Sequence, residues 1–138
     1  MPIRTLLVDD SPEYLRALSR FLASDPEIEI VGQAPSAHDA LEKMDRFQVD
    51  LVLMDLAMPG TNGLEATRWI KARENAPRVL ILTLHDSNEH RAAAQEVCAD
   101  GFVSKLDSDA KLVSLIHTLF APSPAKAAPK APTCTERR

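Results

Sequence analysis

Short apolar runs alternate along the chain with stretches whose apolar residues recur at helical spacing. The runs lie at residues 3–8, 28–31, 50–54, 79–83 and 102–103. They show little polar alternation, which is typical of strands that are covered by helices on both faces. We therefore predict five strands. Residues 50–54 form the most apolar and most central one, whereas Glu29 interrupts residues 28–31.

A stretch with helical spacing follows each apolar run. In the first, Ser11 provides an N-cap and Pro12 the first helical position, and Leu15, Leu18 and Leu22 follow at helical spacing. The other helices are predicted to begin near residues 36, 63, 86 and 107. Alternating strands and helices predict an α/β fold. Because crossovers are right-handed, five such units fit a flavodoxin-like, doubly wound, five-stranded parallel sheet of strand order 2-1-3-4-5.

The helical pattern stops after Phe120. Residues 121–138 contain four prolines, several alanines and no large apolar residue, a composition that is typical of a linker. We expect one folded domain at residues 1–120 and a disordered Pro/Ala/Lys-rich tail or linker at residues 121–138. A chain of 138 residues with 45% apolar composition has room for one domain with a buried core.

The formal charge of −4 is unevenly distributed along the chain. Residues 121–138 carry four basic side chains and one acidic one, a charge of +3, so residues 1–120 carry −7. An acidic domain lacks the basic face that nucleic-acid binding needs. No apolar run approaches a membrane span, and the N-terminus has no secretory pattern. We therefore expect a cytoplasmic protein that binds neither nucleic acid nor a membrane.

Cysteine and histidine show no metal-binding pattern. Cys98 and Cys134 are the only cysteines, and a single pair makes neither a disulfide framework nor a metal knuckle. We interpret both as reduced thiols. His38, His90 and His117 lie on predicted helices without metal-ligand spacing, so we interpret them as surface residues.

Side chains with reactive chemistry fall at the ends of the predicted strands. The pair Asp9 and Asp10 ends the first strand, Asp55 ends the third, Thr83 ends the fourth, and Lys105 follows the fifth. Because the carboxyl ends of parallel strands share one edge of a sheet, where open α/β sheets bind ligands, these side chains should lie together. Three carboxylates and a lysine at that edge predict a site for a cation and a phosphoryl group.

The segments around these residues resemble the response-regulator receiver domain of two-component signalling. They read LLVDD at residues 6–10, DLVLMDLAMPGTNGLEA at residues 50–66 and ADGFVSK at residues 99–105. The resemblance covers about residues 3–120. The third and fifth strand segments are most similar to receivers of LuxR-type regulators.

The resemblance implies a phosphoacceptor signalling domain, not an enzyme that turns over a substrate. Asp55 would accept a phosphoryl group from a histidine kinase or a phosphotransfer protein. Asp9, Asp10, Asp55 and the backbone carbonyl of Ala57 would bind Mg²⁺, with Mn²⁺ as a substitute and Asp9 acting through water. Hard oxygen ligands and retained waters suit Mg²⁺.

The resemblance also implies switch residues. Thr83 and Lys105 would contact phosphoryl oxygens, and Phe102 would follow Thr83 inward. Phosphorylation adds nearly two negative charges, and this change would alter the face made by the fourth helix, fifth strand and fifth helix. Phe102 lacks the hydroxyl of the tyrosine often found there, so we predict a weaker outward preference. Homodimerisation on phosphorylation is an expectation from the family.

Several residues depart from the common family pattern, and we expect them to modulate the site. Leu106 stands where many receivers have a proline joined to the lysine by a cis bond. A cis bond before a non-proline residue costs about 2.5–4 kcal/mol, so we expect Lys105–Leu106 to be trans. Leu84 replaces the usual small residue after the threonine and would crowd the site. Ala57 has no side chain to position a water molecule, a task for which His85 is a candidate.

Two other enzyme or binding classes lack residues that they need. A phosphatase with an aspartate nucleophile needs a second aspartate two residues later, where this chain has Ala57. A nucleotide-binding domain would carry a glycine-rich loop after the first strand, where acids stand instead. Two alternatives remain open: a pseudo-receiver that binds partners without phosphorylation, and the receiver part of a LuxR-type transcription regulator whose DNA-binding domain is missing. Residues 121–138 cannot form a helix-turn-helix, so this chain itself should not bind DNA.

Overall fold

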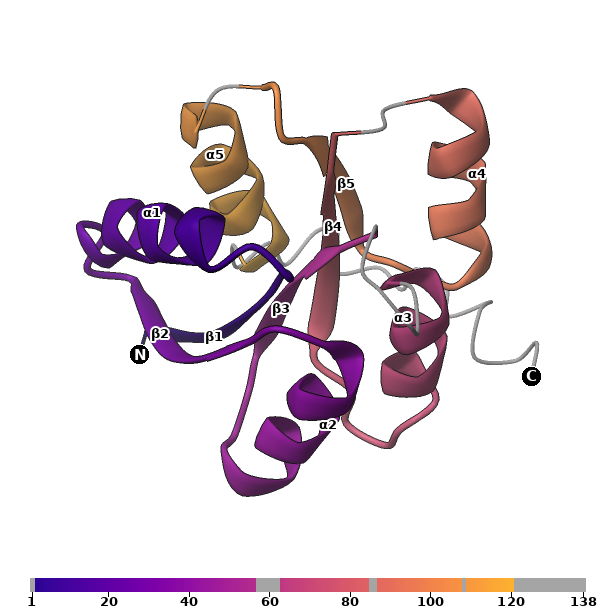
Figure 1. The fold of residues 1–138 in the computed structure, drawn as a ribbon, viewed down its shortest axis with the longest axis horizontal. Helices are drawn as coiled ribbons and strands as arrows, with labels where there is room; N and C mark the ends of the chain where they lie inside the picture. The colour runs from indigo at the N-terminus through magenta and orange to yellow at the C-terminus, as the bar shows by residue number, and fades with distance from the viewer. Residues whose placement is uncertain (1, 57–62, 85–86, 108, 121–138) are drawn as a thin grey trace, which may run out of the picture.

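Five parallel strands form one sheet in the computed structural model, and a helix follows each strand (Figure 1). The structure describes residues 2–56, 63–84, 87–107 and 109–120, so the expected tail lies outside the described residues. The strands are β1 (Ile3–Val8), β2 (Ile28–Ala34), β3 (Leu51–Asp55), β4 (Arg78–Thr83) and β5 (Gly101–Ser104). The helices are α1 (Pro12–Ala23), α2 (Ala37–Arg46), α3 (Gly63–Lys71), α4 (Asn88–Glu96) and α5 (Asp109–Phe120).

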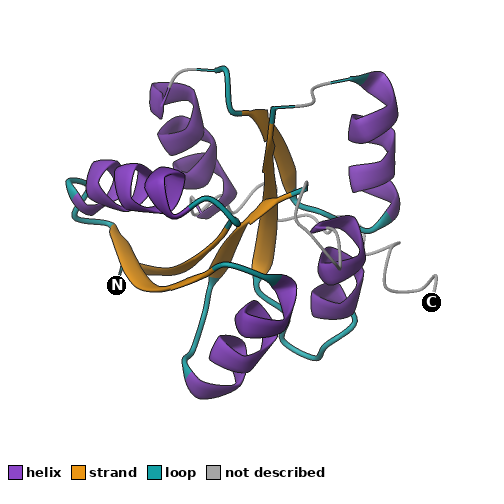
Figure 2. Cartoon of the chain, viewed as in Figure 1, coloured by secondary structure: helices purple, strands orange, loops and turns teal. Residues whose placement is uncertain are grey.

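The strand order is β2-β1-β3-β4-β5, and every neighbouring pair is parallel. Helices cover both faces of this sheet: α1 and α5 lie on one face, and α2, α3 and α4 lie on the other (Figures 1 and 2). The predicted flavodoxin-like, doubly wound architecture is confirmed. None of the described helices is long and apolar enough to span a membrane.

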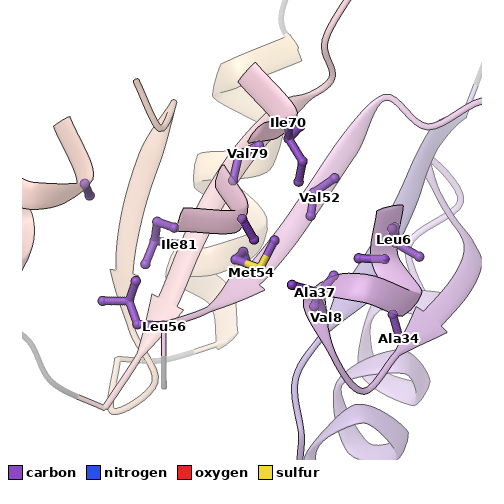
Figure 3. Packing of buried hydrophobic residues seen from close by; sticks show 13 residues of the cluster. Leu6, Val8, Ala34, Ala37, Val52, Met54, Leu56, Ile70, Val79 and Ile81 are labelled. Carbon is purple, nitrogen blue, oxygen red and sulfur yellow. The ribbon is translucent and has the colours of Figure 1, made fainter. Parts of the chain in front are cut away.

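Strand side chains alternate between two apolar clusters. Val52 and Met54 of β3 lie on the same face as Val79 and Ile81 of β4, toward α2, α3 and α4 (Figure 3). The intervening residues of β3 and β4 pack toward α1 and α5. All five residues of β3 are buried, which confirms its predicted central place and explains why its sequence shows no polar alternation.

The helix caps explain where the chain turns from strand to helix. Ser11, Ser36 and Ser87 are N-caps, and each side chain accepts a hydrogen bond from a backbone N–H three residues later. The predicted caps at Ser11 and Ser36 are confirmed. The fourth helix begins at Asn88, two residues later than predicted, because its cap is Ser87.

Two predictions about the chain need correction. The second strand runs to Ala34 instead of residue 31, because Gly32 and Gln33 pair with β1 in spite of their poor strand pattern. Cys98 is disulfide-bonded instead of reduced. Two cysteines alone form no spacing pattern, so the sequence could not predict the bond; Cys134 lies outside the described residues.

Candidate phosphoryl-transfer site

Three carboxylates meet at the carboxyl edge of the sheet. Asp9 and Asp10 follow β1 and Asp55 ends β3, and one oxygen atom from each lies within 4.8 Å of the others. The strands end level with each other because Val8 of β1 pairs with Met54 of β3. Asp9 and Asp55 are buried, whereas Asp10 is exposed. The structure therefore brings together the three acids that the sequence placed at one edge.

Lys105 reaches into this acidic cluster from the end of β5. Its Nζ lies 2.5 Å from Asp9 Oδ2 and 3.3 Å from Asp55 Oδ1, and its side chain is only 12% exposed. The backbone holds it there, since the Lys105 N–H donates to the carbonyl of Thr83 over 2.7 Å. One ammonium group thus pairs with the two buried carboxylates at once.

The cluster carries more negative than positive charge. Burial raises the pKa of Asp55, and the neighbouring Asp9 raises it further, while Lys105 partly offsets both effects. Three carboxylates face one lysine among the described residues of the cluster. Closely spaced carboxylate oxygens are the ligands that Mg²⁺ prefers. The donor set and its charge therefore fit a hard divalent cation.

Backbone contacts fix the two buried acids in place. The Ser11 N–H donates to Asp9 Oδ1 over 2.9 Å, so the residue that caps α1 also orients Asp9. On β3, a Cβ atom at Gly63 would lie 2.1 Å from the carbonyl oxygen of Asp55. The Gly63 N–H donates to the Leu56 carbonyl over 3.0 Å. Only glycine allows α3 to begin so close to the backbone of Asp55.

Thr83 and Phe102 lie on the neighbouring strands β4 and β5. Thr83 is the last residue of β4 and is fully buried, opposite Ser104 of β5. Phe102 is half-buried against the apolar cluster on the α4 side of the sheet. The structure thus places both expected switch residues on the two strands that lead to the edge.

The structure describes two of the four residues that are expected to modulate the site. Leu84 is 58% exposed and Leu106 is 79% exposed, so both side chains lie at the rim of the edge and not within the cluster. The peptide bond between Lys105 and Leu106 is trans, as predicted. Ala57 and His85 lie outside the described residues.

Two residues that no sequence motif marks contact the expected site residues. The ring of Tyr14 lies 4.2 Å from Lys105 Nζ, measured to the ring centre. The guanidinium carbon of Arg91 lies 4.6 Å from the centre of the Phe102 ring. Position 14 stands three residues after the N-cap, on the helical turn next to the acids. That spacing places Tyr14 near the acids along the chain, but no sequence signal pairs it with Lys105, and none pairs position 91 with position 102.

Comparison with known families shows which family the chain belongs to. The family model described as the response regulator receiver domain matches residues 5–117. The chain belongs to the response regulator receiver domain family. Receiver domains of response regulators are signalling domains of two-component systems, so the resemblance predicted from the strand ends is confirmed.

Similar receiver domains come from bacterial regulators. The chain is 33% identical over 109 residues to the transcriptional regulatory protein DegU of Brevibacillus brevis, covering 78% of this chain and 46% of DegU. It is 35% identical over 119 residues to the response regulator UvrY of Escherichia coli (strain K12), covering 86% of this chain and 55% of UvrY. The chain thus spans about half the length of these curated relatives.

A solved structure supports the predicted subgroup. The crystal structure of a two-component response regulator of the LuxR family from Aurantimonas sp. SI85-9A1 superimposes with a TM-score of 0.83 at 34% sequence identity. The match covers 92% of this chain and 94% of that chain. The similarity to LuxR-type receivers is confirmed.

Proposed function

We propose that this receiver domain is the phosphoacceptor of a two-component system and that Asp55 is the nucleophile. One observation carries the proposal. Asp55 lies buried at the end of β3, with the carboxylates of Asp9 and Asp10 within 4.8 Å and Lys105 Nζ at 3.3 Å. A nucleophile, a cation-binding oxygen set and a fixed positive charge are the parts that phosphoryl transfer to a carboxylate needs.

In the proposed reaction, an Asp55 oxygen attacks the phosphorus of a phosphohistidine in line with the leaving nitrogen. The O–P bond forms as the P–N bond breaks, and the imidazole of the donor leaves with the bonding electron pair. Lys105 exchanges a carboxylate partner for a phosphoryl oxygen. A bound Mg²⁺, or Mn²⁺ in its place, would screen the repulsion between the carboxylate and the phosphoryl oxygens.

Asp9, Asp10 and Asp55 would hold that cation, Asp9 through a water molecule, and the backbone carbonyl of Ala57 is the proposed further ligand. The excess negative charge of the cluster supports this assignment. Burial raises the pKa of Asp55, and the negative charge of Asp9 raises it further. Lys105 alone cannot neutralise three carboxylates.

Phosphorylation would act on the α4-β5-α5 face through two side chains. Thr83 would donate its hydroxyl to a phosphoryl oxygen, and the space that it vacates would admit the ring of Phe102. The neighbouring strands β4 and β5 carry these residues with Ile81 opposite Phe102. The changed face would bind an output partner or a second copy of this chain.

Residues at the rim would set how long the phosphoryl group lasts. Leu84 and Leu106 are both well exposed, so they would restrict the approach of donors and of water without filling the site. His85 is proposed to position water, a task that Ala57 cannot perform. We propose that these positions tune dephosphorylation.

The proposal extends to the setting of the receiver domain. The chain spans about half of relatives that include a transcriptional regulatory protein. It would therefore correspond to the receiver part of a LuxR-type regulator, with residues 121–138 as a disordered linker. Its partner would be a cytoplasmic histidine kinase domain or a phosphotransfer protein, and it would not itself bind nucleic acid, insert into a membrane or turn over a substrate.

An intact-mass measurement tests the proposal. The protein is incubated with Mg²⁺ and acetyl phosphate or phosphoramidate, alongside Asp55→Asn and the control Asp45→Asn, an exposed acid of α2. The wild type and the control should gain one labile phosphoryl group, and Asp55→Asn and samples with chelator should not. If the wild type shows neither this gain nor a Mg²⁺-dependent response to beryllofluoride, the pseudo-receiver alternative replaces the proposal.

A further inference from the structure

The ammonium group of Lys105 is enclosed on three sides. Two sides are carboxylates, with Nζ at 2.5 Å from Asp9 and 3.3 Å from Asp55. The third is the face of the Tyr14 ring, whose centre lies 4.2 Å from Nζ. A cation at this distance from an aromatic face is attracted by the ring's negative π-system. Because the lysine side chain is only 12% exposed, water screens this attraction weakly.

Tyr14 is held in this position by the same segment that orients Asp9. The Tyr14 N–H donates to Ser11 Oγ over 3.2 Å, and the Ser11 N–H donates to Asp9 Oδ1 over 2.9 Å. Asp9 Oδ2 then pairs with Lys105, and the lysine returns to the Tyr14 ring. These four residues form a closed circuit of contacts between the start of α1 and the end of β5.

We propose that Tyr14 is a positioning residue of the phosphoryl-transfer site: its ring holds the Lys105 ammonium group beside Asp55. This inference rests on the proposed function. An incoming cation competes with Lys105 for the carboxylates of Asp9 and Asp55. An incoming phosphoryl group competes with those carboxylates for Lys105. The Tyr14 ring carries no net charge, so that competition leaves it in place. It therefore keeps Lys105 at the edge while the lysine exchanges a carboxylate for a phosphoryl oxygen.

A purely structural role is the competing explanation, because Tyr14 also packs against the apolar cluster under α1 and α5. The two roles differ in what the ring must supply. Packing needs the volume of the ring, whereas holding an ammonium group needs the negative face of its π-system. Variants that keep the volume and change the electron density therefore separate them.

The test compares single-turnover phosphorylation rates with phosphoramidate at saturating Mg²⁺. Tyr14→Leu should be roughly 3- to 30-fold slower than the wild type, and Tyr14→Phe should retain most of the rate. A series of increasingly fluorinated phenylalanines at position 14 keeps the ring volume, and its rates should fall stepwise. The matched control is Phe21→Leu, which removes another half-buried ring from α1 and should leave the rate unchanged.

A second measurement follows Lys105 without any phosphorylation. In the metal-free protein, the ring should shift the nuclear magnetic resonance signals of the lysine ε-methylene group, and Tyr14→Leu should abolish that shift while Tyr14→Phe preserves it. Equal rates across the fluorinated series, or a lysine signal that Tyr14→Leu leaves unmoved, would overturn the inference. A wild-type protein that takes up no phosphoryl group would instead overturn the proposed function, so the two failures are distinct.

Discussion

The guanidinium group of Arg91 lies over the ring of Phe102, with 4.6 Å between the guanidinium carbon and the ring centre. Arg91 belongs to α4 and Phe102 to β5, so this contact joins the two elements through the aromatic residue that we propose as a switch. The ring lacks a hydroxyl group that could bond to solvent. Its orientation is therefore governed by the apolar cluster on one side and by Arg91.

Arg91→Gln should loosen the ring of Phe102. A cation over an aromatic ring at a partly exposed site contributes about 0.5–1 kcal/mol, so the population of the alternative ring orientation should rise by roughly 2- to 5-fold. Side-chain coupling constants of Phe102 measure this population with and without beryllofluoride. Glu89→Gln, another charge change on α4, should have no effect. Unchanged couplings in Arg91→Gln would show that packing alone sets the orientation.

Asp55→Asn should stabilise the fold when no divalent cation is present. The pKa of Asp55 is raised by burial and by Asp9, which means that its negative charge is unfavourable in the folded state at neutral pH. The neutral amide removes this cost and should raise the free energy of unfolding. Urea denaturation in chelator measures the gain.

The exposed neighbour Asp10 provides the comparison for that measurement. Asp10→Asn should give a smaller gain, because water already solvates its carboxylate. Adding Mg²⁺ should stabilise the wild type, through preferential binding to the folded state, and should stabilise Asp55→Asn less. A loss of stability in Asp55→Asn without cation would contradict the picture of an overcharged cluster.

His117 should make stability depend on pH. Its Nε2 lies 2.7 Å from Asp25 and its Nδ1 lies 3.3 Å from Glu27. The hydrogen bond to Asp25 raises the pKa of His117 above 6.5, and the same bond lowers the pKa of Asp25 below 3.8. The stabilisation is complete between pH 3.8 and 6.5. It is lost as pH rises through the folded-state pKa of His117, or falls through that of Asp25.

The measurement is the difference in free energy of unfolding between the wild type and His117→Gln across this pH range. The difference should be largest between pH 3.8 and 6.5 and should shrink above it. His38→Gln is the control, because His38 is well exposed and lies 4.0 Å from Glu42. A His117→Gln difference that grows toward alkaline pH would reverse the sign and refute the assignment.

Asp100→Ala should destabilise the domain far more than Asp45→Ala. Asp100 Oδ2 accepts hydrogen bonds from the Val79 N–H and from Lys71 Nζ, both over 2.8 Å. Removing it leaves a buried N–H without that partner, at a cost of about 1–3 kcal/mol. Asp45 pairs with Arg73 on the surface and is 69% exposed, so its removal should cost less than about 1 kcal/mol. Equal losses by thermal unfolding would contradict this ranking.

The sequence predicted those parts of the fold that follow from local pattern and strand direction. Each strand's apolar run, together with right-handed crossovers, was enough to predict the order of the sheet. Asp9 and Asp55 meet because parallel strands end at one edge, so their approach also followed from the sequence. β2 was predicted too short because pairing with β1 outweighs the weak strand pattern of Gly32 and Gln33.

Contacts between helices and the sheet could not be predicted in the same way. Whether Tyr14 reaches Lys105, or Arg91 reaches Phe102, depends on how each helix is rotated and placed on the sheet, which no short sequence pattern encodes. The pair of His117 and Asp25 is separated by 92 residues, and we interpreted His117 only as a surface residue. Such contacts set the electrostatics of individual groups, and they needed the structure.

The central claim is that Asp55 itself accepts the phosphoryl group, and chemical mapping of the modified residue tests it most directly. Borohydride reduces an aspartyl phosphate to homoserine, so the protein is phosphorylated with phosphoramidate and Mg²⁺, reduced, digested and sequenced by mass spectrometry. The account predicts homoserine at position 55 alone, and none when Mg²⁺ is chelated. Homoserine at Asp9, Asp10 or another acid, or a phosphorylated protein with unmodified Asp55, would contradict it.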